Sequence, residues 1–387
     1  MRPRVVRGVL LAAVALGCVV PDAPADSVFG IRGLGLLGRP LSARAAGTGG
    51  GFALFDPATA LNPAAFGQWR VPSGWAVGSP TWRSYDDGVT STALSSTRFP
   101  LFGVAVPAGR RLVIAASIGE FLDRTWAFRT ERDTLIRDTA VTMSDDVRSV
   151  GGVSDLRFAV AYALSGRVLV GLGVHALAGS SQIGVVRRFL DSAGTGLEPY
   201  ASYTDLAVTD LTGASVSAGV QVRASSAVAF SGMVRLNSRL TAKPTRGATA
   251  RVGMPVELGV GAYVAPGRGI GIGASVGYQT WSRATDALVA AGQPAARDVW
   301  NVAAGAEFDA VRLLGRGVPL RVGYRWRQLP FAADAGLLSE SALSGGLGLD
   351  FAGGRATVDI SAEFGTRAAG DQRERFTTGF VGVVVRP

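Results

Sequence analysis

Residues 269–279 read Gly-Ile-Gly-Ile-Gly-Ala-Ser-Val-Gly-Tyr-Gln, a strict alternation of two kinds of side chain. Every second residue from Ile270 onward is apolar, while the positions between them hold glycine, serine or glutamine. Successive side chains of a β-strand point to opposite faces, whereas a helix would bring residues three and four apart together and mix the two sets. The segment is therefore predicted to be a strand with one wholly apolar face.

Charged residues fall on the second face of several similar segments. Arg321 and Arg325 oppose an apolar set, and so do Asp359 and Glu363. An arginine in the middle of a bilayer costs about 2–4 kcal/mol, so the apolar face should meet lipid and the charged face should line a lumen. Because both signs occur, we expect ion pairs across the lumen. The predicted lumen charges are Arg157, Arg223, Arg235, Arg239, Glu257, Glu307, Arg321, Arg325, Asp359 and Glu363.

The strand pattern predicts an all-β fold, a transmembrane antiparallel up-and-down β-barrel of about 14 strands in the bacterial cell outer membrane. Tight turns such as Pro266-Gly267 suit the periplasmic side, and the polar joints 131–147, 188–204 and 284–296 should be outer loops. A large soluble β-sandwich is the alternative, but its outward face would have to be polar. Strands are expected at 72–84, 93–107, 111–130, 148–164, 167–188, 205–223, 226–241, 247–264, 268–283, 297–310, 317–329, 340–351, 354–366 and 374–386.

The first residues have the pattern of a secretory signal. A basic start precedes an apolar run from Val9 to Val20, and Ala23-Pro24-Ala25 supplies the small residues that signal peptidase cuts after. We expect residues 1–25 to be a signal peptide. A cut before Cys18 with lipidation is the alternative, although a small residue stands where that signal normally has a large aliphatic one. Cys18 is the sole cysteine, so no disulfide is expected.

Composition argues against several other functions. The net charge of +10 is almost entirely arginine without a basic run, so lumen and lipopolysaccharide contacts explain it better than nucleic acid does. His175 is the only histidine, and no serine or acid near it in sequence suggests a catalytic group. No residues have metal-ligand spacing. We therefore expect no enzyme activity, cofactor or metal.

Residues 26–70, which we call the hatch segment, do not alternate and are too apolar to lie in water. Residues 71–387 would then form the barrel. The hatch segment contains Gly33-Leu34-Gly35-Leu36-Leu37-Gly38, formally a dinucleotide-binding pattern, but no βαβ unit surrounds it. Asp56-Pro57 and Asn62-Pro63 each place a capping residue before a proline at a first helical position, which predicts two short helices. The lumen is the nearest place to bury such a segment.

The stretch Ala43-Arg44-Ala45-Ala46-Gly47-Thr48-Gly49-Gly50, followed by Asn62-Pro63-Ala64, resembles the N-terminal hatch signature of the long-chain fatty-acid outer-membrane transporter superfamily. That superfamily includes the shuttle barrel of the type IX secretion system. The loop between the two motifs is shorter here, and the chain ends in Arg386-Pro387 rather than in the usual aromatic residue. The resemblance implies a barrel plugged by the hatch segment.

Two functions fit this reading. In the first, the barrel is a passive channel for hydrophobic small molecules, and the hatch segment gates it. In the second, it is a secretion partner that docks or shuttles exported cargo proteins. Outer-membrane lipid and lipopolysaccharide are expected partners in both. The residues we expect to bind ligand or to gate are Phe52, Phe55, Asn62, Pro63 and Phe66.

Overall fold

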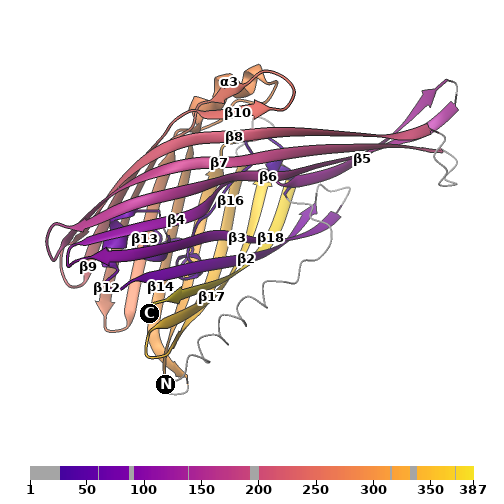
Figure 1. The fold of residues 1–387 in the computed structure, drawn as a ribbon. Coiled ribbons are helices and arrows are strands. Elements are labelled where there is room, and N and C mark those ends of the chain that lie inside the picture. The colour runs from indigo at the N-terminus through magenta and orange to yellow at the C-terminus, as the bar shows by residue number, and fades with distance from the viewer. Residues whose placement is uncertain are drawn as a thin grey trace.

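The computed structural model describes residues 27–59, 61–86, 91–137, 139–191, 200–313, 316–331, 338–370 and 372–387. Within them the chain forms a closed antiparallel β-barrel of 14 strands, which confirms the predicted fold class. The last strand is hydrogen-bonded to the first, so the sheet closes on itself (Figure 1). The predicted signal peptide, residues 1–25, lies outside the described residues. The wall strands are β2 (Ser73–Asp86), β3 (Ser91–Ala108), β4 (Leu112–Asp123), β6 (Thr139–Ala163), β7 (Val168–Asp191), β8 (Tyr200–Arg223), β9 (Val228–Asn237), β12 (Val256–Gly267), β13 (Ile270–Gln279), β14 (Val299–Leu313), β15 (Arg316–Leu329), β16 (Leu338–Phe351), β17 (Ala356–Ala369) and β18 (Gln372–Val385).

Shorter strands and helices accompany the wall. Strand β5 continues the line of β4, β10 continues that of β9, and β11 precedes β12. Among the described residues, no helix is long and apolar enough to cross a membrane. The shorter elements are η1 (Val28–Gly30), β1 (Leu36–Leu37), α2 (Ala43–Gly47), η2 (Pro57–Thr59), η3 (Pro63–Gln68), β5 (Trp126–Ile136), β10 (Leu240–Pro244), β11 (Ala250–Val252), η4 (Trp281–Ala284) and α3 (Thr285–Ala290).

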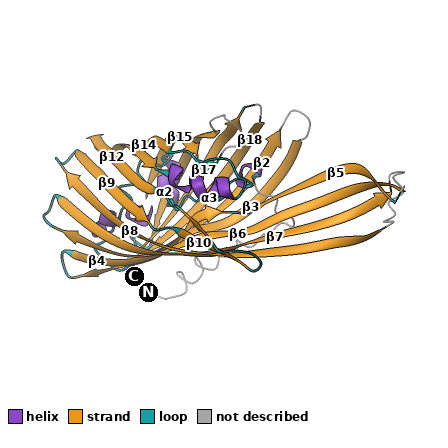
Figure 2. Ribbon diagram, turned by 90° about the horizontal axis from the view of Figure 1, so that it is seen from above, coloured by secondary structure: helices purple, strands orange, loops and turns teal. Residues whose placement is uncertain are grey.

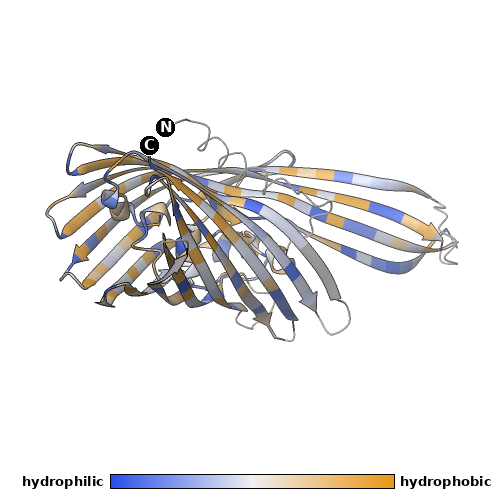
Figure 3. Ribbon diagram, turned by 90° about the horizontal axis from the view of Figure 1, so that it is seen from below, coloured by the Kyte–Doolittle hydropathy of each residue, from blue (hydrophilic) through white to orange (hydrophobic). Residues whose placement is uncertain are grey.

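The wall strands carry the expected alternation of faces. Val322 and Ile360 are 50% and 45% exposed on the outside, whereas their neighbours Arg321 and Ser361 are buried inside. Figure 3 shows the same alternation as bands of contrasting hydropathy along the strands. An outward apolar surface of this kind is stabilised by lipid, and charged neighbours such as Arg321 point inward, away from it.

Four strands project beyond one end of the barrel as an ordered sheet, which we call the arm (Figures 1 and 2). Strands β6, β7 and β8 have 25, 24 and 24 residues, whereas a barrel strand crosses a bilayer in about 9–11. The arm consists of β5 and of those parts of β6, β7 and β8 that extend beyond the length needed to cross the bilayer. Its pairing is regular, as in Val141↔Asp191. The ion pair of Arg129 with Asp146, at 2.6 Å, links neighbouring strands.

The prediction that 131–147 and 188–204 are loops is therefore wrong for most of these residues, while 138 and 192–199 lie outside the described ones. Both faces of the arm stand beyond the apolar band, so its strands carry polar residues on the solvent side. Such polar strands have the composition of a loop, so the sequence pattern did not identify them as strands. The third predicted joint, 284–296, folds over one end of the barrel through η4 and α3, and its Trp281 and Leu288 are buried.

We predict that Val322→Arg reduces the folded fraction of barrel in lipid vesicles, because it places a charge on the lipid face at a cost of about 2–4 kcal/mol. Val322→Ala, which keeps the face apolar, should fold nearly as well as the parent. Gel migration with and without boiling measures the folded fraction. Equal folding of the two variants would mean that Val322 does not face lipid.

Candidate functional site

The hatch segment lies inside the barrel (Figure 2). Helix α2 packs against β16 and β17 on one side, and η3 packs against β6, β7 and β8 on the other. The hatch residues Ala45, Phe66 and Trp69 share a buried cluster with the wall residues Leu101 and Phe380. The apolar character that made this segment unsuited to water is thus used against the inner wall.

The first anchor of the hatch segment is its glycine loop. Thr48 and Gly49 lie directly on the backbone of two wall glycines, Gly305 of β14 and Gly323 of β15, where an added Cβ would overlap the loop. Gly49 and Gly50 also have positive φ angles of 65° and 96°, a conformation that costs other residues free energy. The backbone of the loop meets the backbone of the wall because Gly305 and Gly323 have no side chains to separate them.

The second anchor is the Asn-Pro-Ala motif. The Oδ1 atom of Asn62 accepts a hydrogen bond from the Ala64 N–H at 2.9 Å, so Asn62 caps η3 as predicted. Its Nδ2 atom donates to Ser231 Oγ of the wall at 2.7 Å, a contact that the sequence did not indicate. Wall glycines again make room, because a Cβ on Gly171 or Gly219 would overlap the motif.

Ion pairs join the hatch segment to the predicted lumen charges. Arg44 donates two hydrogen bonds, of 2.9 and 2.7 Å, to the carboxylate of Glu307. Arg39 donates to Glu363 at 2.5 Å, and Arg325 donates to the other oxygen of that carboxylate. Buried charges are tolerated only when paired in this way. The hatch segment therefore completes a network whose other members are on the wall.

Most of the predicted lumen charges do belong to this interior. Arg321 pairs with both Glu307 and Asp359 at 2.6 Å, which links β15 to β14 and β17. Arg157 and Arg235 are also buried, whereas Arg223 and Arg239 are exposed, so the prediction is wrong for these last two. Arg223 ends β8, and Arg239 falls in the break between β9 and β10, where the alternation no longer determines which face a side chain takes.

The glycines of the false dinucleotide pattern have a different purpose. Strand β1 pairs with β4 at Leu36↔Asp123, and the N–H of Gly38 donates to the carbonyl of Phe121 at 2.9 Å. A Cβ on Gly35 or Gly38 would overlap the backbone of β4. The spacing of these glycines therefore allows the hatch segment to lie against the edge of a wall strand.

That edge is exposed because the wall is incomplete at this point. Strands β3 and β4 are paired only from Ala108↔Leu112 to Leu101↔Gly119. Beyond that point β3 stays paired with β2, and β4 with β6 and β1. Pro100, which has no N–H to donate, stands where the pairing stops. We call this break in the ladder the seam.

A side chain bridges the seam where the backbone does not. The NH1 atom of Arg98, on β3, lies 2.7 Å from Glu120 Oε1 and 2.5 Å from Asp123 Oδ2, both on β4. At the seam these ion pairs, and not a β-ladder, join the two strands.

A cavity of about 180 Å³ lies between the hatch segment and the wall beside β4. Leu41, Leu54 and Leu61 line it from the hatch side, and Phe121 and Met233 from the wall. Charged side chains also line it: Arg39, Glu120, Asp155, Arg235, Glu257, Arg325 and Arg327. A second cavity of about 480 Å³ opens at the end with the short turns, lined by Trp69, Trp75, Asp359 and Arg386 among others.

The residues chosen from the sequence as ligand or gating residues surround the first cavity without lining it. Phe52 packs edge-on against Tyr263 of the wall, with ring centroids 5.4 Å apart, and Phe55 lies 6.0 Å from the same ring. Phe66 is fully buried beside Trp75. Their neighbours Leu54 and Leu61 reach the cavity instead. The alternation gave no signal for this, because it does not extend into the hatch segment.

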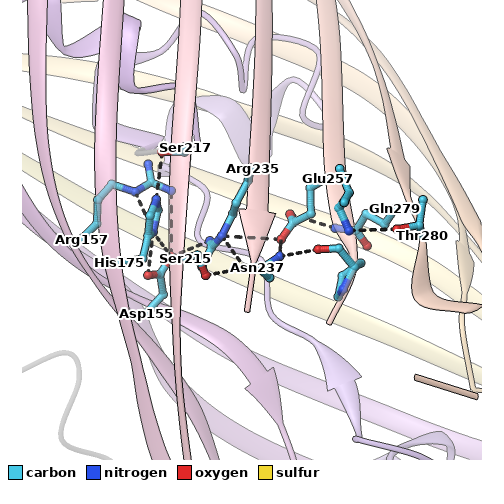
Figure 4. A network of polar contacts seen from close by, with 12 residues as sticks. Asp155, Arg157, His175, Ser215, Ser217, Arg235, Asn237, Glu257, Gln279 and Thr280 are labelled. Atoms are coloured by element: carbon cyan, nitrogen blue, oxygen red, sulfur yellow. Dashed lines mark hydrogen bonds and ion pairs between the residues drawn. The ribbon is translucent and has the colours of Figure 1, made fainter. Parts of the chain in front are cut away.

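A network of polar side chains surrounds His175 on the inner face of the wall (Figure 4). The imidazole Nδ1 lies 2.8 Å from Asp155 Oδ1, and Nε2 lies 2.9 Å from Ser217 Oγ. This is the order of groups in a serine hydrolase, and sequence analysis missed it because strand register alone brings the three residues together. The register places His175 opposite Arg157 on β6 and opposite Ser215 on β8. Asp155 and Ser217 are each two residues along from these positions, so they lie on the same face as His175 and within its reach.

The histidine and the serine of this network are buried away from both cavities. The side chain of His175 has no exposed surface, and neither it nor Ser217 lines either cavity. Arg235 donates to Asp155 at 2.7 Å and to Asn237 at 2.9 Å, extending the network from β6 to β9. Asp155 and Arg235 line the first cavity, but His175 and Ser217 do not, and the bonds of the network join four neighbouring strands. We therefore assign the network a role in bracing the wall.

No family model and no curated protein matches the chain. Solved structures do. The Ralstonia pickettii toluene transporter TbuX has 16% identity and a TM-score of 0.62, covering 93% of this chain and 100% of its own. The CymD monoaromatic hydrocarbon channel has 16% identity and a TM-score of 0.58, with coverage of 92% and 99%. A Pseudomonas aeruginosa FadL homologue has 13% identity and a TM-score of 0.59, with coverage of 90% and 98%. The chain is thus similar in fold to FadL-type barrels.

We predict that Gly323→Ala loosens the hatch segment, because the new Cβ would overlap Thr48. Gly345→Ala on β16 is the matched control, since its Cβ would have only the carbonyl of Arg321 within reach, at 3.6 Å. Both barrels should fold, but only Gly323→Ala should show higher single-channel conductance in a planar bilayer. Equal conductance would show that the glycine contact does not hold the hatch segment in place.

Proposed function

We propose that this protein is an outer-membrane barrel for passive uptake of small hydrophobic molecules, and that the hatch segment controls their passage. The observation that carries the proposal is the cavity between the hatch segment and the wall, next to the seam, where apolar side chains such as Leu54, Leu61 and Phe121 form part of the lining. A barrel with only a structural role would not need a space with apolar lining beside a break in its own wall.

The size and lining of the cavity favour a small apolar ligand. Its volume of about 180 Å³ is of the order that holds one aromatic ring, since an engineered cavity of about 150 Å³ binds benzene. Leucine, phenylalanine and methionine side chains line one part of this protein's cavity, and charged side chains line another. Two of the barrels with a similar fold are a toluene transporter and a monoaromatic hydrocarbon channel, which supports this choice of ligand class.

The contacts of the hatch segment are consistent with a gate. Ion pairs of Arg39 and Arg44, the hydrogen bond of Asn62 and the apolar packing of Phe66 hold it against the wall. Breaking a hydrogen bond costs about 1–3 kcal/mol and breaking a buried ion pair about 3–5 kcal/mol. A rearrangement of part of the segment therefore requires less free energy than unfolding the barrel. The seam next to β1 offers the corresponding route sideways through the wall, toward lipid, where an apolar molecule is most soluble.

We predict that deleting residues 28–66 leaves a folded barrel that leaks polar solutes. Without the hatch segment, the interior of a 14-strand barrel is too wide for its own side chains to fill. Release of a hydrophilic dye from vesicles measures the leak, and labelled toluene measures hydrophobic uptake. The parent barrel should take up toluene and retain the dye.

The contradicting outcome is a deletion variant with parental dye retention and parental toluene uptake. If such a variant also failed to export a partner protein, the secretion role would replace uptake. The arm is the observation that favours this second candidate, since a long ordered projection suits the docking of a protein. A variant lacking residues 132–142 at the arm tip separates the two roles, because it should keep its toluene uptake.

A further inference from the structure

Arginines gather at the end of the barrel with the short turns. Each of the five turns described there has one beside or within it, and two more lie near the ends of the hatch segment and of β18. All but the last are exposed. These residues, which we call the arginine ring, are Arg70, Arg110, Arg111, Arg167, Arg223, Arg268, Arg355 and Arg386.

Within the described residues, most guanidinium groups of the arginine ring have no acidic side chain paired with their positive charge. Arg70 and Arg386 donate to carbonyl oxygens of the chain, but the guanidinium groups of the other six make no hydrogen bond or ion pair within the described residues. The exposed acids of the strands at this end are Asp309 and Asp350. At the opposite end, by contrast, arginines such as Arg129 and Arg187 are each paired with an aspartate.

The ring also lies at a defined depth. Outward apolar side chains continue almost to the turns: Leu164 is 55% exposed three residues before Arg167, and Ile270 is 39% exposed two residues after Arg268. At about 3.3 Å per residue, the arginines stand within roughly 10 Å of the end of the apolar band. The headgroup layer on each side of a bilayer is about 5–7 Å thick, so the side chains reach the level of lipid phosphates.

We propose that the arginine ring binds the phosphate groups of anionic phospholipids in the leaflet on the side of the short turns. Guanidinium groups pair with phosphate through two parallel hydrogen bonds, which makes arginine well suited to this task. The turns that carry them are distributed from the β3–β4 to the β16–β17 connection, around the barrel rather than on one flank. Lipid surrounds the barrel in the same way, whereas a docked protein would favour a single patch.

The test compares two variants of the full chain with the same loss of charge. One carries Arg→Gln at 110, 111, 167, 223 and 268. The control carries Gln at Arg148, Arg188, Lys243, Arg246 and Arg251, which are exposed residues at the opposite end. Each barrel is reconstituted in phosphatidylcholine vesicles, and electron paramagnetic resonance measures the association of spin-labelled phosphatidylglycerol relative to spin-labelled phosphatidylcholine.

We expect the parent and the control to prefer phosphatidylglycerol, by about fivefold at sites where one arginine contacts the lipid, and the ring variant to lose most of this preference. One molar salt should abolish the preference in the parent, because it shortens the screening length to about 3 Å.

Arg110→Gln with Arg111→Gln, a milder change, should give a partial loss of the preference if the larger variant does not fold. An unchanged preference in the folded ring variants would overturn the proposal and leave the ring to an acidic soluble partner. The result is independent of the uptake function.

Discussion

The space inside the barrel is the constraint on which the rest of the structure depends. Fourteen strands enclose more volume than their inward side chains can fill. This chain does not fill it with large wall residues. It places glycine at inward positions of β7, β8, β14 and β15, and the backbone of the hatch segment occupies the space that their side chains would have taken. The wall and the hatch segment are thus complementary surfaces of one chain.

The charges follow from the same arrangement. A carboxylate or guanidinium removed from water is stable only beside its opposite, and two such pairs here take one partner from the hatch segment and one from the wall. Arg44 with Glu307 and Arg39 with Glu363 therefore fix the position of the hatch segment more specifically than apolar packing can. Where the wall lacks backbone pairing, at the seam, Arg98 supplies the link.

The strands were predictable because lipid outside and polar groups inside impose a period of two on the sequence. The alternation located all fourteen wall strands, most of them to within a few residues. It missed the long extensions of β6, β7 and β8, it joined β4 to the start of β5 in 111–130, and it joined β11 to β12 in 247–264. It could not locate the arm, because a sheet beyond the membrane loses the outward apolar face. The predicted up-and-down order gave the neighbouring strands but not the register between them, so the seam and the contact of His175 with Asp155 and Ser217 emerged only from the structure. The capping role of Asn62 was local and predictable, whereas its bond to Ser231 was not.

Locking the hatch segment to the wall tests the central claim that its movement controls passage. A Cβ on Gly47 would lie 3.2 Å from that of Ser361, close to the separation of about 3.8 Å in a disulfide, so Gly47→Cys with Ser361→Cys should cross-link α2 to β17. The measurement is uptake of labelled toluene into vesicles before and after reduction, with each single cysteine variant as a control. We predict that oxidation blocks uptake and that reduction restores it. Equal uptake in the cross-linked and reduced barrels would contradict the account.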